Sequence, residues 1–360
     1  MKQLEHVPSL RNCAFSVISV ISVFLVWAGD IRAAIPNTVD NVKNVVRDYG
    51  AVGDGVVDDT TAIQNAINGL GIHDSLFFPA GKYKTTSTLL ISGKTNVTLS
   101  GPRAQIICAS TTDDAVKLYN SSYVTLYGFF IMNTNGGNGI TLDSSVRTIL
   151  REVNVWDCKK YNLYATNSWW LAAEDSYFRK CGTSYSSVYL GNGMNNTRFK
   201  SCIVSRCDNT TGVSVDCVSG FNIVFDGCDV SYSKIGINVT GSTCVNITGC
   251  YFENNETTIA FGDSTHWPAF LTVDSCWFNI QGTSPVKTGI HLIRGTDVSI
   301  RNSRFCGNGS GSTYGDTAIK ADNADLSRAI IDKVPYIECD VVIDDPGHKI
   351  MKPTLENATP

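Results

Sequence analysis

Residues 140–165 read ITLDSSVRTILREVNVWDCKKYNLYA, and they span one full period of a repeat that recurs between Val116 and Ala321. Each period opens with two apolar residues that flank one variable residue, as in Ile140-Thr141-Leu142. We assign the second apolar residue to the interior, which gives the inward series Leu118, Leu142, Ala165, Leu190, Val215, Val239, Phe261, Leu292 and Ala321. Steps of 22 to 31 residues are too long for hairpins and fit a solenoid whose strands stack on their equivalents in the next coil.

Two further strands are predicted in each coil. The second inward series is Leu126, Leu150, Ala173, Phe199, Phe225, Ile247, Val273 and Ile300, and the third is Ile131, Val155, Phe178, Val204, Val230, Phe252, Phe278 and Phe305. The third series follows the second by five residues every time, which indicates a tight corner. The predicted fold is all-β, a single-stranded right-handed parallel β-helix of about nine to eleven coils, with the handedness taken from the crossover rule. Separate antiparallel sandwiches would lack such fixed offsets.

Composition and charge limit the functional classes. Charged residues make up 17% of the chain and hydrophobic residues 43%, which is typical of a globular protein with a sizeable core. The net charge of -4 provides no basic surface for nucleic acid. An acidic polysaccharide would therefore have to meet local positive residues.

The N-terminal segment has the layout of a signal peptide. Lys2 and Arg11 come before an apolar run from Cys13 to Ala28, and the possible cleavage sites end in small residues, at residues 26–28 (VWA) or at residues 32–34 (RAA). A run of about 16 residues is shorter than the roughly 20 that span a bilayer. We predict a secreted, periplasmic or cell-surface protein without stable membrane insertion after cleavage, and a retained anchor is the alternative. The expected domains are residues 1–34 as signal peptide or anchor, 35–95 as N-terminal cap and first coils, 96–345 as the β-helix, and 346–360 as a tail.

The phase of the cysteines argues against a disulfide framework. Cys202, Cys228, Cys250 and Cys276 share one inward position, and Cys158, Cys181 and Cys207 share one corner position. Equivalent side chains in a parallel stack lie about 4.8 Å apart, and a free cysteine is a small, readily buried residue. We therefore expect reduced ladders, with disulfides as the alternative for an exported chain. A metal site is not predicted, because no CxxC pair or histidine cluster accompanies the cysteines.

The segment before the repeats carries a family resemblance. Residues 46–55 read VRDYGAVGDG, residues 58–67 read DDTTAIQNAI, and residues 76–83 read LFFPAGKY. This segment resembles the opening of the pectate-lyase-superfamily β-helix proteins, a group that includes rhamnogalacturonase-like enzymes, some polysaccharide lyases and epimerases, and phage tailspikes. Beyond it, only the coil pattern is shared.

A short capping helix is predicted within this segment. Gly53 and Gly55 permit a tight turn, and residues 58–60 can cap a helix start. The apolar face of the helix would be Ala62, Ile63, Ala66 and Ile67. Such a helix would close the open end of the solenoid, which needs a terminal cap. The alternative for Asp54, Asp58 and Asp59 is a metal or acid/base cluster.

The first strand is the expected floor of any cleft, because the links that lead to it vary in length and surface loops on a rigid scaffold usually bind ligands. Its outward positions are Lys117, Thr141, Tyr164, Tyr189, Ser214, Asn238, Ala260, His291 and Lys320. His291 and Lys320 occupy neighbouring coils beside the long links 279–289 and 307–318, and Glu256 and Asp316 come just before their strands. An imidazole, a cation and carboxylates on one groove can perform acid/base catalysis, so these four are the candidate catalytic residues.

Four residues are candidates for substrate binding. Tyr164 and Tyr189 lie on neighbouring coils and can offer their rings to sugars, and Asn238 lies on the same row. Trp267 lies in the longest link between a first and a second strand, on the other rim of the cleft. The alternative is that these are ordinary residues of an exposed sheet.

These features predict an exported carbohydrate-active protein that cleaves a pectin-like or other acidic polysaccharide by lyase or hydrolase chemistry. A non-catalytic polysaccharide-binding surface protein or adhesin is the alternative. The motifs of the polygalacturonase-type relatives are not reproduced: residues 133–135 lack the acid, and residues 318–320 keep the lysine without the arginine. No cofactor is predicted with certainty; calcium is an option for a lyase, although no compact carboxylate cluster for it is visible. The sequence leaves the oligomeric state open.

Overall fold

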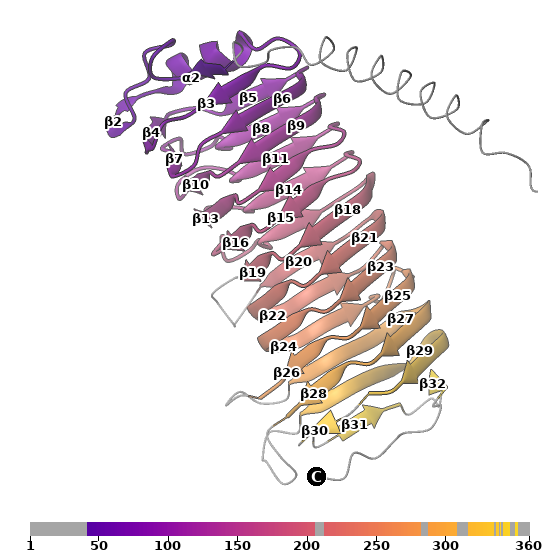
Figure 1. The fold of residues 1–360 in the computed structure, drawn as a ribbon. Coiled ribbons are helices and arrows are strands. Elements are labelled where there is room, and N and C mark those ends of the chain that lie inside the picture. Colours follow the sequence, from indigo (N-terminus) through magenta and orange to yellow (C-terminus); the bar gives the residue numbers. More distant parts are fainter. Residues whose placement is uncertain are drawn as a thin grey trace, which may run out of the picture. The chain divides into compact units, whose positions relative to one another are not determined.

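The computed structural model describes residues 42–205, 212–281, 287–307 and 316–334, with shorter pieces at 336–337, 339, 341–345 and 350–351. The chain divides into two compact units, Met1–Val42 and Lys43–Pro360, and the second forms the solenoid drawn in Figure 1. The predicted signal peptide at residues 1–34 and the link segments 282–286 and 308–315 lie outside the described residues. Within the described part, no helix is long and apolar enough to cross a membrane.

The first strands of successive coils form the first sheet. Its members are β5 (Leu89–Ser92), β8 (Val116–Tyr119), β11 (Ile140–Asp143), β14 (Leu163–Thr166), β17 (Val188–Leu190), β20 (Val213–Cys217), the second halves of β22 (Asp229–Val239) and β24 (Tyr251–Phe261), the first halves of β27 (Thr288–Arg301) and β29 (Thr317–Asp332), and β31 (Val341–Asp344). Neighbours pair in parallel and in register, so Ile140 lies beside Leu163 and Leu142 beside Ala165. Alternate residues therefore form continuous inward and outward rows.

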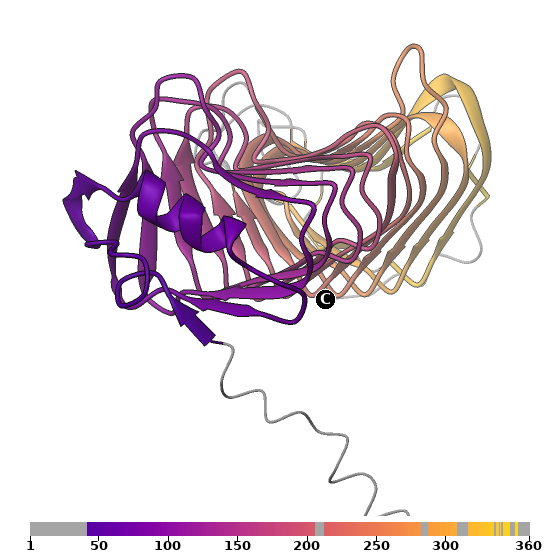
Figure 2. The ribbon, with the colours of Figure 1, turned by 90° about the horizontal axis from the view of Figure 1, so that it is seen from above.

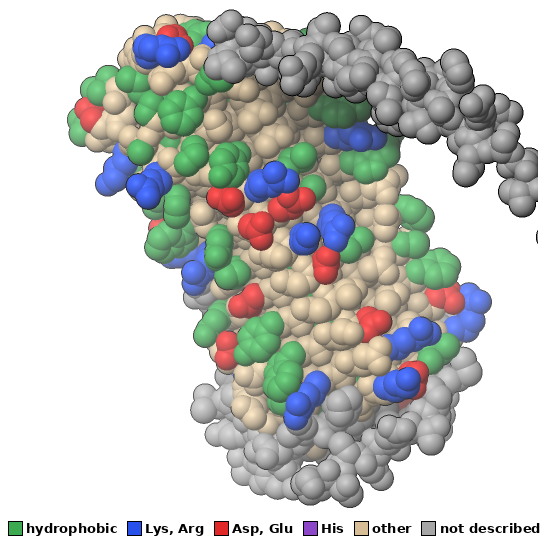
Figure 3. Space-filling view, in the orientation of Figure 1, with side chains coloured by type: hydrophobic (Ala, Val, Ile, Leu, Met, Phe, Trp, Pro, Cys, Tyr) green, Lys and Arg blue, Asp and Glu red, His purple; other side chains and the backbone are tan. Residues whose placement is uncertain are grey.

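The second strands form a second sheet. Its members are β1 (Val42–Asn44), β3 (Ser75–Phe77), β6 (Thr95–Ser100), β9 (Ser122–Tyr127), β12 (Ile149–Arg151), β15 (Ala172–Glu174), β18 (Met194–Lys200), β21 (Gly220–Asp226), β23 (Thr243–Thr248), β25 (Ala269–Asp274), the second halves of β27 and β29, and β32 (Ile350–Met351). Acidic and basic side chains gather in the middle of the face shown in Figure 3. On this sheet Arg151 pairs with Glu174 at 2.6 Å, and solvent-exposed pairs of this kind contribute about 0 to 1 kcal/mol.

The third strands form a third sheet. Its members are β2 (Asp54–Asp58), β4 (Gly81–Thr85), β7 (Ala104–Cys108), β10 (Phe130–Asn133), β13 (Asn154–Cys158), β16 (Tyr177–Arg179), β19 (Ile203–Ser205), the first halves of β22 and β24, β26 (Trp277–Asn279), β28 (Arg304–Cys306) and β30 (Tyr336–Ile337). The unit is an all-β parallel solenoid of about 10 turns, which confirms the predicted fold class.

One predicted register is wrong. The sequence pattern placed Val215 beside Leu190, but β17 and β20 pair Val188 with Val215 and Leu190 with Cys217. The apolar series continues through Cys217, which is fully buried and acts as a small apolar residue. A slip of two residues keeps each side chain on its face, but it changes the neighbours. Asp216, rather than the predicted Ser214, is therefore the outward residue beside Tyr189.

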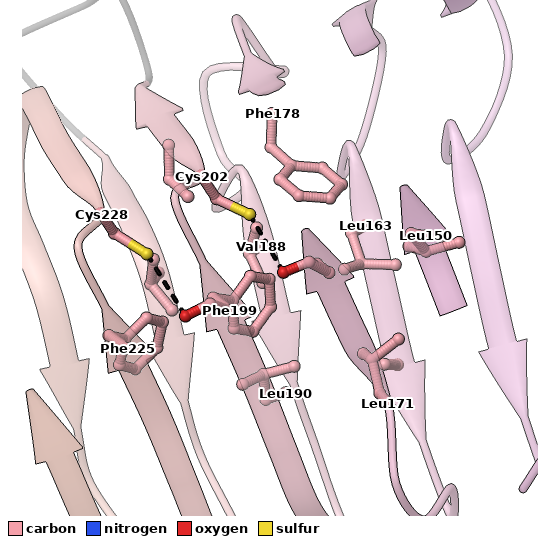
Figure 4. Packing of buried hydrophobic residues seen from close by; sticks show 14 of the residues in the cluster. Leu150, Leu163, Leu171, Phe178, Val188, Leu190, Phe199, Cys202, Phe225 and Cys228 are labelled. Atoms are coloured by element: carbon pink, nitrogen blue, oxygen red, sulfur yellow. Dashed lines mark hydrogen bonds between the residues drawn. The ribbon is translucent and has the colours of Figure 1, made fainter. Parts of the chain in front are cut away.

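The interior of the solenoid is filled by columns of like side chains. Phe199 and Phe225 stack with ring centroids 5.2 Å apart, and Figure 4 shows them among the neighbouring aliphatic residues. Phe252 stacks on Phe278 at 4.8 Å, and Phe278 stacks on Phe305 at 4.3 Å. All five rings are fully buried. The predicted inward columns of the second strand (Phe199 and Phe225) and of the third strand (Phe252, Phe278 and Phe305) therefore form part of the packed core.

The five-residue corner between the second and third strands depends on a left-handed residue in each coil. Examples are Asp175, Ser201, Gly227, Gly249 and Ser275, with φ values between 49° and 62°. The residue after it forms hydrogen bonds with the neighbouring coils at the bend, where the strand pairing is interrupted. Cys228 donates its thiol to the carbonyl of Phe199 in the preceding coil, and its own backbone N–H faces the sulfur of Cys250 in the next one.

Serine replaces cysteine at both ends of this corner ladder. The Ser176 hydroxyl donates to the carbonyl of Leu150, and the Ser303 hydroxyl accepts from the backbone N–H of Cys276. A small side chain with one donor and one acceptor satisfies buried backbone groups where the strand bends. This explains why the ladder cysteines are free, as predicted. Cys207, the third member of the predicted corner set, lies outside the described residues.

The helix of the described residues, α2 (Thr60–Asn68), lies across the first coils of the solenoid in the view of Figure 2. Ile63, Ala66 and Ile67 are buried on its inner face. The predicted cap is only partly right. Asp58 accepts the backbone N–H of Thr60, but Asp59 caps nothing with its side chain. Its carboxylate instead accepts the N–H groups of residues 52 and 53, which fastens the glycine turn to the helix.

Replacing Phe252 with alanine should lower the free energy of unfolding by about 3 to 5 kcal/mol, because the change opens a cavity in a stacked column. Chemical denaturation of the parent and the variant measures the difference. Tyr251→Ala is the matched control, since Tyr251 is the adjacent exposed residue and its loss should cost below about 1 kcal/mol. Equal midpoints for parent and Phe252→Ala would show that this column is not packed.

Thiol titration of the denatured chain without reductant should find every described cysteine reactive. The eleven are Cys108, Cys158, Cys181, Cys202, Cys217, Cys228, Cys244, Cys250, Cys276, Cys306 and Cys339. The ladder thiols serve the backbone as donors, so oxidation would remove those hydrogen bonds. A titration that finds most cysteines already paired would contradict the ladder.

Candidate functional site

The outward positions of the first sheet form one continuous row. In register, it reads Lys117, Thr141, Tyr164, Tyr189, Asp216, Asn238, Ala260, His291, Lys320 and Asp344. We call these residues the outer row. Parallel stacking places equivalent positions about 4.8 Å apart, so side chains on several coils are spaced to contact one extended chain molecule.

Tyrosines form the first part of the site. The rings of Tyr164 and Tyr189 are stacked, with centroids 4.9 Å apart and an angle of 5° between the planes. Tyr161 packs against both at 5.2 Å and against Tyr185 at 5.0 Å. Burial raises the pKa of Tyr161 to about 12, so its hydroxyl stays protonated and can donate a hydrogen bond. The predicted pair is thus part of a larger cluster of four half-buried tyrosines.

Tyr161 and Tyr185 were not predicted, because both precede the strands β14 and β17 and fall outside the strand alternation. The recurrence of tyrosine just before two successive strands was the available signal. Together, the four rings supply a wide apolar surface with hydroxyls at its margin. Such amphipathic surfaces suit sugars, whose rings are apolar on their faces and polar at their edges.

A carboxyl group follows the tyrosines on the outer row. Asn238 donates its side-chain N–H to Asp216 at 3.0 Å. Burial raises the pKa of Asp216, and this hydrogen bond from Asn238 opposes the rise only in part. A half-buried carboxyl beside an aromatic platform is an expensive arrangement for a surface position, and such groups concentrate at functional sites.

His291 and Lys320 meet a carboxylate that the sequence pattern missed. Asp322 lies 3.1 Å from Nε2 of His291 and 3.8 Å from Nζ of Lys320. The histidine contact is short, but its angle is not that of a hydrogen bond. Asp322 comes two residues after Lys320, so alternation places it on the same outward face, one outward position beyond the outer row. A prediction that considered the outer row alone therefore missed it. Strand β29 shifts register just beyond this point, between the partners of Leu292 and Arg294.

The other two predicted catalytic residues lie elsewhere on the sheet. Glu256 and Asp316 precede Thr257 and Thr317, which pair with Thr288 from either side. They therefore flank Lys287, four residues before the outer row, which is roughly 13 Å away at about 3.3 Å per residue. The predicted group of four is not compact.

Lys287 explains the position of these carboxylates. Its side chain is 5% exposed, and its ammonium group donates to the carbonyl of Gln281 at 2.8 Å. Burial lowers the pKa of Lys287, whereas the charges of Asp316, Glu253 and Glu256 oppose the fall. The carboxylates thus stabilise a buried cation, and the pattern is that of an internal charge ladder.

Trp267 is exposed, as expected of a ligand-contacting residue, but the guanidinium of Arg294 lies 5.2 Å from its ring centroid. Arg294 also donates to the carbonyl of Ser264. The loop 262–268 connects the first and second sheets, so Trp267 lies beside the outer row rather than on it.

The described residues contain no group of three or more His, Cys, Asp or Glu side chains that could hold a metal ion. The predicted option of calcium thus has no cage made by these side chains, and no step is assigned to it. The alternative metal cluster of Asp54, Asp58 and Asp59 also fails, because these carboxylates accept backbone and hydroxyl hydrogens in the turn.

Residues 42–279, more than half of the chain, match the family described as rhamnogalacturonase A/epimerase, pectate lyase-like. The chain belongs to this family. The match spans the glycine turn, α2 and most coils of the solenoid, including the tyrosine cluster and the pair of Asp216 and Asn238. The resemblance carried by residues 46–83 is therefore confirmed.

Individual relatives are more distant. The tail spike protein of Shigella phage Sf6 is 24% identical over 339 residues, covering 80% of this chain and 53% of its own length. The chain thus spans about half of that relative. The polygalacturonase of Erwinia carotovora has a TM-score of 0.64 at 10% identity, with 89% and 98% of the two chains covered. The tailspike of E. coli bacteriophage HK620, solved with a pentasaccharide, has a TM-score of 0.63 at 13% identity over 87% of this chain and 65% of its own. These likenesses show the fold.

Asp216→Asn should be more stable than the parent at neutral pH. The pKa of Asp216 is higher in the folded chain than its value of 3.8 in the unfolded chain. The stability of the parent therefore falls as the pH rises from 3.8 through the pKa of the folded chain. Asparagine carries no charge to desolvate and still accepts from Asn238. The melting temperatures of the parent and of Asp216→Asn should therefore differ at pH 7 and converge at about pH 3. A variant less stable than the parent at pH 7 would contradict this account of the site.

Proposed function

We propose that this protein binds an acidic polysaccharide along the outer row of the first sheet and cleaves it as a lyase. The observation that carries the proposal is the order of groups on one row: stacked tyrosines, the pair of Asp216 and Asn238, and then His291 with Lys320 and Asp322. Aromatic rings, amide groups and cations are what a chain of uronic acids needs for stacking, hydrogen bonding and charge neutralisation. Family membership supports a carbohydrate ligand.

Distances favour elimination over hydrolysis by two carboxylates. Asp216 lies three coil steps from His291, which is about 14 Å at about 4.8 Å per step. Glycosidases place their two carboxyl groups roughly 5 to 9.5 Å apart, so Asp216 and the Asp322 group cannot serve one glycosidic bond in that way. His291, Lys320 and Asp322 are compact enough to act together at one sugar.

In the proposed elimination, Lys320 pairs with the uronate carboxylate and makes the neighbouring C–H more acidic. A small rotation of His291 aligns Nε2–H with Asp322, which leaves Nδ1 as the base that takes the proton from this carbon. The electron pair of the C–H bond forms a C=C bond while the glycosidic C–O bond at the next carbon breaks. The departing oxygen takes a proton from water. The products are one unsaturated end and one new hydroxyl end.

We include export in the proposal, and its support is the N-terminal apolar run between Cys13 and Ala28. The same protein recovered from outside the cells should begin after residue 28 or residue 34, which mass spectrometry of the intact chain measures. A chain that keeps its first residues and stays with the membrane fraction would contradict export.

Purified protein incubated with a panel of polysaccharides should release products that absorb as unsaturated sugars. His291→Ala and Lys320→Ala should each lower turnover by about two orders of magnitude, as is usual for the loss of an acid/base group. Arg151→Ala is the control, because its ion pair with Glu174 lies on the second sheet. New reducing ends without unsaturated products would replace the lyase with a hydrolase.

Binding without cleavage is the second candidate function. It is favoured by the roughly 14 Å that separate the Asp216 group from the His291 group, since three coil steps of about 4.8 Å leave two partial sites rather than one. Retained binding by a protein that yields no product from any polysaccharide would support it. In that case, Tyr164→Ala and Tyr189→Ala should weaken binding while His291→Ala leaves it nearly unchanged.

A further inference from the structure

The third sheet carries a hollow that the outer row does not reach. It measures about 500 Å³ and is lined by side chains of β10, β13 and β16: Phe130, Asn154, Val155, Trp156, Tyr177, Arg179 and Lys180. Figure 3 shows hydrophobic side chains along the margin where Figure 1 places these strands. The hollow thus lies on a different sheet from the site proposed above.

The register explains why a hollow forms here. Phe130, Asn154 and Tyr177 occupy one outward position in three successive coils. The short side chain of Asn154 lies between two rings that are about 9.6 Å apart at about 4.8 Å per coil. Trp156, two residues further along β13, forms the third aromatic side. Two rows of a flat sheet therefore frame a depression one coil wide.

The three rings are exposed to solvent. The exposed fractions of Phe130, Trp156 and Tyr177 are 40%, 50% and 39%. Within the described part of the chain, no other ring or cation stacks on them. Trp277, lower on the same sheet, is exposed to a similar degree, but the guanidinium of Arg304 lies 4.7 Å from its ring centroid. Clustered exposed aromatic surface of this kind marks interaction sites.

The charged groups of the hollow favour an anionic partner. Lys180 is neutralised by Asp157 at 2.9 Å. Arg179 makes no hydrogen bond or ion pair within the described residues, so its five N–H donors stay available. Asp229 is a carboxyl group that acts on it electrostatically; burial raises the pKa of Asp229, and the hydrogen bond from Ser231 and the charge of Arg179 oppose the rise. The guanidinium thus keeps the ability to bind a carboxylate in the two-pronged way typical of arginine.

We propose that this hollow is a second glycan-binding site, which takes a uronic acid unit with its ring against Trp156 and its carboxylate on Arg179. An apolar peptide would leave the guanidinium and the amide of Asn154 unmatched, whereas an acidic sugar uses the rings, the amide and the cation together. The inference does not rest on cleavage at the outer row, because the two sites lie on different sheets. A polysaccharide held at both would bind more tightly than at either alone.

The test measures binding of polygalacturonate and of its methyl-esterified, uncharged form by calorimetry, in the full chain that carries Tyr164→Ala and Tyr189→Ala. These two changes weaken the outer row, so the remaining affinity reports on the hollow. Adding Trp156→Ala or Arg179→Gln should lower that affinity for polygalacturonate about tenfold or more, because the first change removes the stacking surface and the second removes the charge-assisted hydrogen bonds to the carboxylate. Arg179→Gln should have little effect on the esterified form.

Trp277→Ala is the matched control, because it removes an equally exposed ring from the same sheet outside the hollow. Unchanged affinity in both hollow variants, or an equal loss in Trp277→Ala, would overturn the proposal. Light scattering distinguishes the other occupant: a dimer of the parent that Trp156→Ala dissociates would show that a second copy of the chain covers the hollow. If the parent protein cleaves no polysaccharide but still binds polygalacturonate at the hollow, the proposed function is contradicted and this inference stands.

Discussion

In-register parallel pairing is the constraint on which the rest of this structure depends. Each strand hydrogen-bonds to its equivalent in the coils on either side, so a residue's neighbours are set by its phase in the repeat. The phenylalanine column, the cysteine and serine corner ladder, and the outer row are three results of that rule. A side chain that is tolerable alone must be tolerable when stacked at about 4.8 Å on its neighbours. Apolar and hydrogen-bonding columns meet this condition easily, and columns of like charge do not.

The same rule identifies two buried or half-buried ionisable groups whose desolvation lowers the stability of the fold. Lys287 is a buried cation held among carboxylates, and Asp216 is a half-buried acid beside tyrosines. A carboxyl group at the position of Asp216 is not needed to close a coil, since Thr141 and Asn238 fill that position in other coils. Lys287 has the partners that a structural role requires. Asp216 has one amide donor and an open aromatic neighbour, and this difference is why the proposed ligand path passes over Asp216 and not over Lys287.

The periodicity of the sequence was sufficient to predict most of the fold. The five-residue corner, the inward columns and the free cysteines follow from spacing alone, because a closed coil repeats its geometry. The left-handed corner residues were not predicted, because the position holds aspartate, serine or glycine in different coils and no one residue type marks it. The register of β20 was misjudged because Cys217 was not counted as apolar, and that error hid Asp216.

The candidate site was harder to predict than the fold. Alternation within strands found Tyr164, Tyr189, Asn238, His291 and Lys320, which the structure places on one row. It gave no access to Tyr161 and Tyr185, which precede their strands. Asp322 faces outward two residues after Lys320, and it was missed because only the outer row was considered. Glu256 and Asp316 were grouped with His291 because all three lie near the same long links. Their position along the strand was not considered, and four residues separate each carboxylate from the outer row.

The most direct test of the central claim is chemical footprinting of tyrosines with and without an acidic polysaccharide. The claim is that the outer row of the first sheet is the main ligand surface. It predicts that Tyr164 and Tyr189 lose reactivity when the polysaccharide is bound, while Tyr232 and Tyr251, exposed elsewhere, react as before. Equal modification of Tyr164 and Tyr189 in the free and saturated protein would contradict the account.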